Sequence, residues 1–398
     1  MSSVFQQLAK LTGGDILGEL DNCKFFIDTG SLATNYVCSG RFIGGGIPGQ
    51  RMTEIFGPSA SGKSYIASNI LKGCQDVGGW PIMLDVENAS NAEWMEKSSH
   101  LDTSRVFRYT PLTLERAFNK IHNVTRTIRE YEAKHNLPRK PIVVSYDSIS
   151  ASPCERELKE INLPEDYTAT QFKKIVGGKE QPGERARVCS AELRKLQPIL
   201  QKEDVTVIFI NQVRDAISLY GPSETTAGGG RSLRFYASCV IRTQQKKKIE
   251  HQRLKSFSGI NLQVKNVKNR AFRPFVCHEG IRLYFDSGLN PLTGLLTALI
   301  EDERIVPSGR GSYMINDGSE ESPKFRSSME RNDVPMEFLL EHPELIDASS
   351  AEEVADYLKN YQDAIEATNG GAYVEKPLSS DDDDDDDDED EEEDDDLV

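Results

Sequence analysis

The sequence predicts an α/β fold in which a mainly parallel, twisted sheet is flanked by helices. Several short segments are apolar throughout instead of alternating, which is typical of strands buried on both faces. Segments with helical spacing separate these runs, as in units that alternate strand and helix. A glycine-rich motif joins the first central strand to the first of these helices. The predicted strands are residues 52–56, 81–86, 142–146 and 205–210.

Two helices are predicted between these strands. Residues 64–74 have apolar side chains at helical spacing, and residues 114–131 present a longer apolar face. Thr110 with Pro111 can begin the second helix, and Pro138 can end it, because proline is tolerated in a first turn and interrupts a helix elsewhere.

The chain is predicted to divide into four parts. After the central strands, residues 231–285 indicate consecutive strands in an antiparallel extension, and residues 290–370 indicate a smaller helical unit. The predicted parts are an N-terminal oligomerisation segment with a short helix at 1–28, a central α/β core at 29–288, a small C-terminal domain at 289–376 and a disordered acidic tail at 377–398.

The negative charge of the chain is concentrated at one end. The 398 residues carry a net charge of −17, yet residues 381–396 are 16 consecutive acids, and the remaining 48 acids nearly balance 47 bases. The body can therefore still carry a basic groove for nucleic acid. The acidic run cannot fold by itself. We expect it either to mimic a phosphate chain over a basic surface or to serve as a solubility tail.

The composition also bears on the compartment. A hydrophobic content of 37% is enough for a core and excludes wholesale disorder. Seven cysteines without a C-x-x-C pair favour a reducing compartment over a disulfide framework or a zinc module. We find no signal peptide, and the apolar runs are too short to span a bilayer. A cytoplasmic protein that uses no membrane is expected, in the host cytoplasm if the source is a phage.

A phosphate-binding loop lies between the first central strand and the first of the two helices. The pattern G-x-x-x-x-G-K-[ST] is filled by Gly57, Pro58, Ser59, Ala60, Ser61, Gly62, Lys63 and Ser64. Its glycines let backbone N–H groups turn toward phosphates, and the helix N-terminus adds a positive dipole end. Lys63 can reach the β- and γ-phosphates and Ser64 can ligate Mg²⁺, so ATP with Mg²⁺ is the expected cofactor.

Two carboxylates follow buried strands and are candidate members of the same site. Asp147 ends the strand at 142–146 and could hold Mg²⁺ with Ser64, although it could instead cap a turn with Ser148. Glu87 closes the strand at 81–86 and could activate the attacking water. The alternative for Glu87 is a helix-capping or solvated residue.

Taken in combination, these motifs resemble the RecA family of strand-exchange recombinases, and the resemblance covers roughly residues 25–300. The bacterial branch and the phage branch of UvsX type both fit. The segments that carry the resemblance are TGSL at 29–32, the glycines of 44–49, MLDVE at 83–87, VIFINQVR at 207–214, PSETTAGG at 222–229, LRFYAS at 233–238, VKNVKNRAFRP at 264–274 and residues 288–296.

The resemblance implies a role for several side chains. Glu87 would activate water, and Gln212 would sense the γ-phosphate. Lys268 and Arg270 would reach the ATP of a neighbouring subunit and stabilise charge in the transition state. Trp94 would pack on adenine. From the residues alone, Trp94 could equally be a core aromatic, and Lys268 and Arg270 could be solvated charges at a strand edge.

The resemblance also places DNA contacts in a polar, glycine-rich loop at 213–230. Small residues there can bring backbone N–H groups against phosphates, and an aromatic ring can stack on a base. A first DNA-binding loop is expected within 150–190, without a residue assignment, and a lysine run at 246–248 is either a solvated hairpin tip or a duplex contact. The candidate DNA-binding residues are Arg214, Tyr220, Thr225, Thr226, Gly228, Gly229, Gly230 and Arg231.

The function that these inferences favour is an ATP-dependent DNA recombinase. It would form helical filaments on single-stranded DNA, with ATP at the subunit interfaces, and promote pairing and strand exchange with homologous duplex. Single-stranded-DNA-binding or mediator proteins are possible further partners. One alternative is a hexameric helicase of the same fold, against which the short N-terminal segment argues. A second is a non-catalytic filament protein that uses nucleotide as a switch, against which the complete set of Lys63, Ser64, Glu87 and Asp147 argues.

Overall fold

A computed structural model of the chain describes residues 4–13, 23–88, 90–157, 184–216, 223–226, 230–251, 256–319, 321–327, 333–369 and 373–377.

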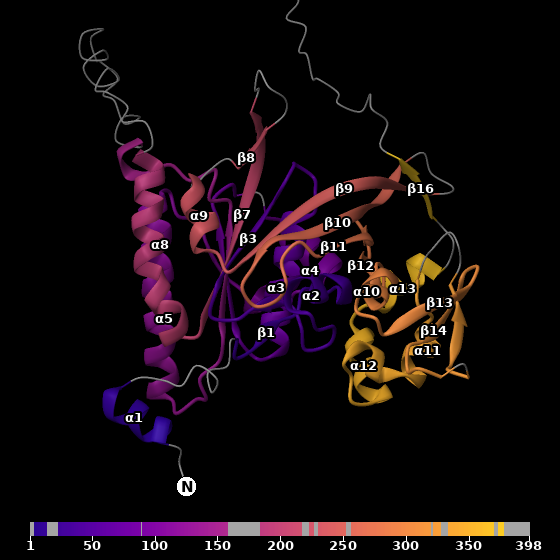
Figure 1. Cartoon of the computed structure of the whole chain (residues 1–398). Helices are drawn as coiled ribbons and strands as arrows, with labels where there is room; N and C mark the ends of the chain where they lie inside the picture. Colours follow the sequence, from indigo (N-terminus) through magenta and orange to yellow (C-terminus); the bar gives the residue numbers. More distant parts are fainter. Residues whose placement is uncertain are drawn as a thin grey trace, which may run out of the picture.

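A large mixed sheet runs through the centre of the molecule (Figure 1). Within the described residues its strand order is β12-β11-β10-β9-β3-β7-β6-β4-β5. From β9 to β5 every neighbouring pair is parallel. The parallel strands after β9 are β3 (Met52–Gly57), β7 (Val205–Ala216), β6 (Ile142–Asp147), β4 (Trp80–Asp85) and β5 (Phe107–Tyr109). The predicted mainly parallel α/β fold is confirmed.

The other side of the sheet is antiparallel. It consists of β9 (Cys239–His251), β10 (Phe257–Asn269), β11 (Cys277–Tyr284) and β12 (Gly288–Leu289). The predicted antiparallel extension is therefore present, but its first residues were assigned wrongly. They form the helix α9 (Gly230–Tyr236), which buries Leu233 in the core.

Helices cover both faces of the sheet. They are α3 (Lys63–Asp76), α4 (Ala92–Ser99), α5 (Leu114–Lys134) and α8 (Glu184–Lys202). The predicted start of α5 was wrong, because Thr113 is the N-cap and its side chain accepts a hydrogen bond of 3.2 Å from the Arg116 N–H. Leu114, Phe118 and Ile121 are buried on the inner face of this helix.

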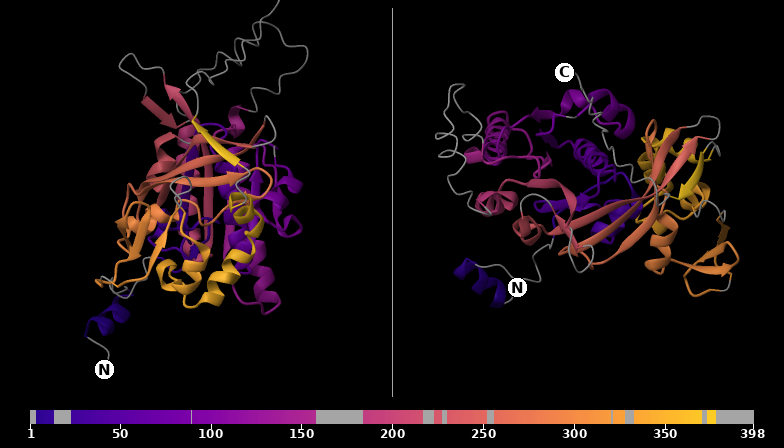
Figure 2. Two further views of the ribbon diagram at one scale, coloured as in Figure 1. Left: turned by 90° about the vertical axis from the view of Figure 1, so that its right-hand side faces the viewer. Right: turned by 90° about the horizontal axis from the view of Figure 1, so that it is seen from above.

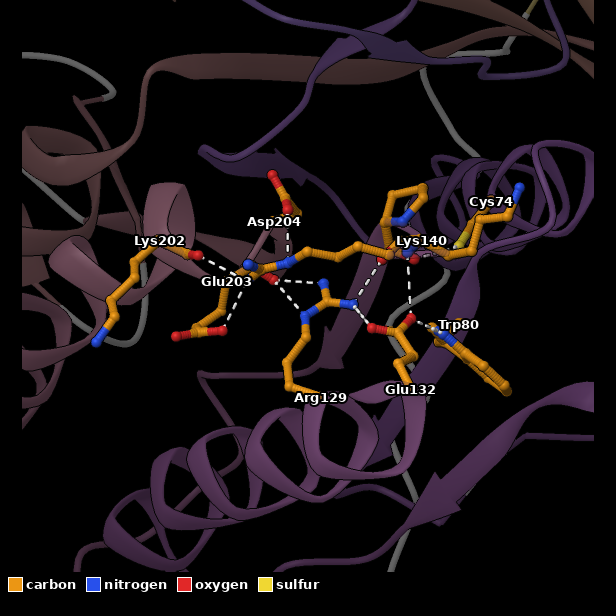
Figure 3. Close-up of polar contacts among 10 residues, drawn as sticks. Cys74, Trp80, Arg129, Glu132, Lys140, Lys202, Glu203 and Asp204 are labelled. Atoms are coloured by element: carbon orange, nitrogen blue, oxygen red, sulfur yellow. Dashed lines mark hydrogen bonds and ion pairs between the residues drawn. The ribbon is translucent and has the colours of Figure 1, made fainter. Parts of the chain in front are cut away.

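A polar cluster ties α5 to the edge of the sheet where the parallel strands begin (Figure 3). Glu132 accepts hydrogen bonds from Arg129 (2.6 Å), from the Trp80 indole (2.8 Å) and from the backbone N–H of Lys140 (3.1 Å). Arg129 also donates to the carbonyl of Glu203, just before β7. These partners lie at the starts of β4, β6 and β7. The cluster therefore fixes the position of α5 relative to the edge of the sheet where the parallel strands begin.

We expect Glu132→Ala to lower the free energy of unfolding by about 3–5 kcal/mol, because the buried Arg129 guanidinium would lose its counter-charge. Urea unfolding followed by far-ultraviolet circular dichroism measures this loss. The control is Glu130→Ala on the same helix, whose side chain is 71% exposed and 3.8 Å from Arg126. It should lose no more than about 1 kcal/mol. Equal losses in the two variants would contradict a structural role for the cluster.

The N-terminal helix α1 (Val4–Thr12) leaves its apolar side chains uncovered. Val4, Phe5, Leu8 and Leu11 are 52–82% exposed. Figures 1 and 2 show α1 set apart from the sheet. The chain continues through β1 (Phe26–Ile27), the fully buried α2 (Leu32–Ser39) and β2 (Ile47–Pro48) to β3.

The C-terminal part combines helices with a small sheet. Its helices are α10 (Leu295–Glu301), α11 (Met336–Glu341), a short 3-10 helix (Pro343–Ile346), α12 (Ala351–Lys359) and α13 (Gln362–Asn369). The helices predicted at 290–370 are present, but the prediction missed three strands. β13 (Ile305–Gly309), β14 (Ser312–Ile315) and β15 (Lys324–Arg326) form an antiparallel sheet. Gly311, at a φ of 69°, permits the tight turn between β13 and β14.

The C-terminal part is fastened to α2 and the loop that follows it. The N–H of Phe42 donates to Asp347 (2.8 Å), and the N–H of Ile43 donates to the carbonyl of Ile346 (3.1 Å). One continuous hydrophobic cluster contains Tyr36 of α2 together with Ile346 and Val354.

The last described strand, β16 (Tyr373–Pro377), pairs antiparallel with the outer half of β9. Figure 2 shows it crossing above the C-terminal part. The acidic run predicted to be disordered lies outside the described residues. In the part of the chain that the structure describes, no helix is both long and apolar enough to cross a membrane.

Candidate nucleotide-binding site

A cavity of about 450 Å³ opens where the central parallel strands end. Ligands of open α/β sheets bind at this edge. The phosphate-binding loop forms its floor. Asp147 at the end of β6, Glu87 just beyond β4 and Gln212 within β7 reach it from three neighbouring strands. The remaining lining residues are Tyr65, Trp94, Ile210, Gln245, Lys248, Phe257, Ile260, Leu283 and Phe285.

The phosphate-binding loop has a backbone conformation that requires its glycines. Gly62 adopts a left-handed conformation (φ 76°) directly before α3. A Cβ atom at Gly57 would collide with the backbone oxygen of Thr243, so the close approach of β9 requires glycine there. The Ser61 and Thr243 hydroxyls lie 2.9 Å apart and hold the loop against β9. Thr243 is a contact that the sequence reasoning missed.

Lys63 is folded into the loop. Its side chain is almost fully buried, and its ammonium donates to the carbonyls of Gly57 (3.1 Å) and Pro58. Burial lowers the pKa of Lys63, and the nearby carboxylates of Asp147 and Glu87 oppose that shift. A buried ammonium held by carbonyl groups of its own loop is well placed to bind the phosphates of a nucleotide.

The predicted carboxylates meet at this site. The Ser64 hydroxyl donates to Asp147 over 2.6 Å, and the Ser148 hydroxyl donates to Glu87 over 2.7 Å. Burial raises the pKa of Asp147, the hydrogen bond from Ser64 lowers it, and the Glu87 carboxylate raises it further. A cation at this point would relieve the unfavourable charge, and hydroxyl and carboxylate oxygens are the ligands that Mg²⁺ accepts.

Trp94 lies on the wall of the cavity and not in the core. It is 37% exposed, and its ring meets the Tyr65 ring edge-on, with the two ring centroids 5.6 Å apart. The alternative of a core aromatic is therefore wrong. Phe257 and Lys248 form another part of the wall, with the Lys248 ammonium 4.9 Å from the centre of the Phe257 ring.

The lysine run at 246–248 lies inside β9 and not at a hairpin tip, so the prediction of a solvated tip was wrong. Lys246 is 3.7 Å from Glu279, and Lys248 lines the cavity. Neither these lysines nor Phe257 was assigned to the nucleotide site from the sequence.

Lys268 and Arg270 are not brought to this cavity. Lys268 lies near the end of β10 and donates to the carbonyls of Arg234 (2.8 Å) and Phe235 (2.7 Å). Burial, with a further contribution from Arg270, lowers the pKa of Lys268 to about 8, while Glu54 opposes the shift. Lys268 is therefore held by α9 and is not a freely solvated charge, whereas Arg270 is exposed.

The polar loop predicted at 213–230 is partly a ribbon of two strands, so its assignment as a continuous loop was wrong. The strand β7 continues to Ala216 and pairs antiparallel with β8 (Ser223–Thr226), setting Arg214 opposite Thr225 and Val213 opposite Thr226. Cross-strand pairs and β-branched threonines favour such an extension. We call these two segments the ribbon.

The other candidate DNA-binding residues are only partly described. Gly230 and Arg231 begin α9. Tyr220, Gly228 and Gly229 lie outside the described residues, as does most of the region expected to hold the first DNA-binding loop.

A strand, a phosphate-binding loop and a helix, with carboxylates at neighbouring strand ends, define a nucleoside-triphosphatase of the P-loop class. The chain belongs to the RecA family, because the family model of the RecA N-terminal domain matches residues 4–128 and 173–290. This confirms the resemblance inferred from the sequence.

Curated relatives extend the similarity over most of the chain. The chain is 30% identical to Protein RecA of Thermus aquaticus over 340 residues, which cover 83% of this chain and 85% of that protein. It is 28% identical to Protein RecA of Aquifex aeolicus (strain VF5) over 326 residues, 81% of each chain.

Proposed function

We propose that this protein is a DNA-dependent ATPase that assembles into helical filaments on single-stranded DNA. In this state it would promote pairing and strand exchange with homologous duplex. The observation that carries the proposal is the continuity of β7. This strand brings Gln212 to the nucleotide cavity and, two residues later, Arg214 to the ribbon. A continuous strand that joins the two sites gives a physical route between nucleotide state and DNA binding.

The cavity supports the following roles in hydrolysis. Lys63 and the loop N–H groups hold the β- and γ-phosphates. Glu87, steadied by Ser148, accepts a proton from the attacking water. Trp94 packs against the base.

Magnesium fits this site as a partner of the nucleotide. Among the described residues, no group of three or more His, Cys, Asp or Glu side chains is placed to hold a metal ion. Ser64 and Asp147 would therefore bind Mg²⁺ together with phosphate oxygens and water, which is the usual way that proteins hold this ion. Mg²⁺ would neutralise charge that develops on the phosphates.

The ribbon and its surroundings would bind the DNA backbone. Arg214, Thr225 and Thr226 come from the two paired strands, and Gly230 and Arg231 follow at the start of α9. We assign phosphate contacts to these residues and to Gly228 and Gly229, and base stacking to Tyr220.

Filament formation would complete the ATP site. Lys268 and Arg270 lie outside the cavity of their own chain, so they would act on the nucleotide of a neighbouring subunit. The exposed apolar face of α1 supports contact with a second copy. Single-stranded-DNA-binding or mediator proteins would assist assembly in the cytoplasm, or in the host cytoplasm for a phage protein.

Complementation between two inactive variants tests the shared site. We expect mixed Lys63→Ala and Arg270→Ala chains to recover part of the ATPase activity, because some interfaces then join an intact loop to an intact Arg270. Phosphate release is measured after co-assembly on single-stranded DNA, with each variant alone as the control. Co-assembled filaments that show no recovery would contradict action across the interface.

The proposed function as a whole is tested by ATPase rates with and without single-stranded DNA and by electron microscopy with DNA and ATP. Stimulated hydrolysis and helical filaments are the expected result. Closed rings with directional unwinding would identify a helicase. Filaments without hydrolysis would identify a nucleotide-switched binding protein.

A further inference from the structure

A buried carboxylate lies behind the phosphate-binding loop, outside the nucleotide cavity. Glu54 is in the middle of β3, three residues before Gly57, and is 1% exposed. Its Oε1 accepts a hydrogen bond of 3.0 Å from the side chain of Asn211, and its Oε2 lies 3.7 Å from the Arg234 guanidinium. An ionised group in the centre of a sheet is unfavourable unless such partners compensate it.

The two partners of Glu54 lie at opposite ends of the segment predicted to bind DNA. Asn211 precedes Gln212 on β7, where the chain enters the ribbon. Arg234 lies on α9, where the chain has left it. Glu54 is thus the point at which the entry and the exit of this segment meet the strand that leads into the phosphate-binding loop.

The same cluster holds Lys268. The ammonium of Lys268 donates to the backbone carbonyls of Arg234 and Phe235, the last turn of α9. A displacement of α9 therefore moves the acceptors of Lys268 together with the counter-ion of Glu54. The charges are also coupled. Burial raises the pKa of Glu54, and the positive charges of Arg234 and Lys268 both oppose that rise.

The cluster has unused bonding capacity and room to rearrange. Among the residues that the structure describes, Glu54 Oε2, Asn211 Oδ1 and two guanidinium nitrogens of Arg234 are buried and have no hydrogen-bond partner. Arg234 also borders a cavity of about 170 Å³ that is shared with Phe56 and Val213. A contact of 3.7 Å between Arg234 and Glu54 can shorten to a charge-assisted hydrogen bond if α9 moves. Elements with two such arrangements can transmit a change between sites.

We propose that Glu54 is a positioning residue that couples the ribbon to Lys268, so that DNA bound at the ribbon sets the position of Lys268 through Arg234. The proposal rests on the function proposed above. It assigns Glu54 no contact with nucleotide or DNA.

The test is Glu54→Gln, which keeps the size of the side chain and an acceptor for Asn211 but removes the charge that holds Arg234. We expect the stimulation of ATPase activity by single-stranded DNA to fall about tenfold. Affinity for a fluorescent ATP analogue without DNA should stay within about twofold of the unmodified chain, because Glu54 is outside the nucleotide cavity. The matched control is Glu132→Gln, which changes a buried glutamate of α5 that is paired with Arg129. This variant should keep the stimulation.

The pH profile provides a readout that a general loss of stability would not move. The charged and titratable groups around Glu54 and Lys268 include Arg234, Arg270 and Cys189. Arg242 of β9 and Lys265 of β10 border the same cavity as Arg234. Lys268 loses its charge as the pH rises through its pKa of about 8. Removal of the Glu54 charge lowers that pKa further, so the alkaline loss of DNA-stimulated activity should begin at lower pH in Glu54→Gln.

The outcomes separate this inference from the proposed function. If DNA does not stimulate the unmodified chain, the proposed function is wrong and the inference falls with it. If DNA stimulates the unmodified chain and Glu54→Gln equally, or if Glu132→Gln loses as much stimulation, only the inference is overturned. Should Glu54→Gln fail to fold, Arg234→Met replaces it. The Arg234 side chain is 39% exposed, and this variant should show the same loss of stimulation; full stimulation there overturns the inference.

Discussion

Lys63→Ala is expected to lower ATP turnover by at least ~10³-fold and to weaken nucleotide binding. The ammonium is buried inside the phosphate-binding loop and bonded to carbonyl groups of that loop, so nucleotide phosphates are its natural counter-charge. Alanine would remove the ammonium that compensates the γ-phosphate charge both when ATP binds and when the phosphate leaves.

Steady-state phosphate release and titration with a fluorescent ATP analogue measure the two effects. Lys72→Ala is the matched control. Lys72 lies on the same helix α3, pairs with Asp76 at 2.6 Å and does not line the cavity. The Lys72→Ala variant should keep the ATP turnover of the unmodified chain. Near-normal turnover in Lys63→Ala would contradict the assignment of this loop as the catalytic phosphate site.

Glu87→Gln is expected to separate binding from chemistry. Glutamine keeps the size of Glu87 and an oxygen that accepts the Ser148 hydroxyl, but it cannot take a proton from water. ATP and single-stranded DNA should still bind, while turnover falls by ~10²–10⁴-fold.

Single-turnover hydrolysis and equilibrium binding of ATP and DNA check this result. Glu93→Gln, in the first turn of α4 and outside the cavity lining, is the control and should remain active. An equal loss of ATP affinity in Glu87→Gln would show instead that Glu87 is structural or a metal ligand.

The elements that the sequence predicts well are those whose residues carry a local signal. The central strands are continuous apolar runs, and the phosphate-binding loop has a fixed spacing, so the loop, β3, β4 and β6 were located within one residue, whereas β7 continues beyond its predicted end to Ala216. The ribbon was missed because Arg214 and Thr225 are polar and their pairing depends on contacts across the loop. The small sheet β13-β14-β15 was missed because its short strands were grouped with the surrounding helices.

The candidate site likewise contains residues that could be predicted from the sequence and residues that could not. Glu87 and Asp147 were predictable because parallel strands end at one edge of a sheet. Thr243, Lys248 and Phe257 were not, because they come from an antiparallel hairpin that folds over the cavity. Glu54 did leave a signal, a single carboxylate within an apolar strand, but only the structure shows its partners Asn211 and Arg234.

The attachment of the C-terminal part has a consequence for how the molecule unfolds. The same hydrophobic cluster runs from α2 through the sheet to α12, and hydrogen bonds join Phe42 and Ile43 to residues beyond 340. A boundary crossed by so many contacts is a poor place for partial opening. The two parts should therefore melt in a single cooperative transition, and their slowest-exchanging amides should share one opening free energy. A chain truncated before residue 340 would leave the backbone N–H groups of Phe42 and Ile43 without these acceptors.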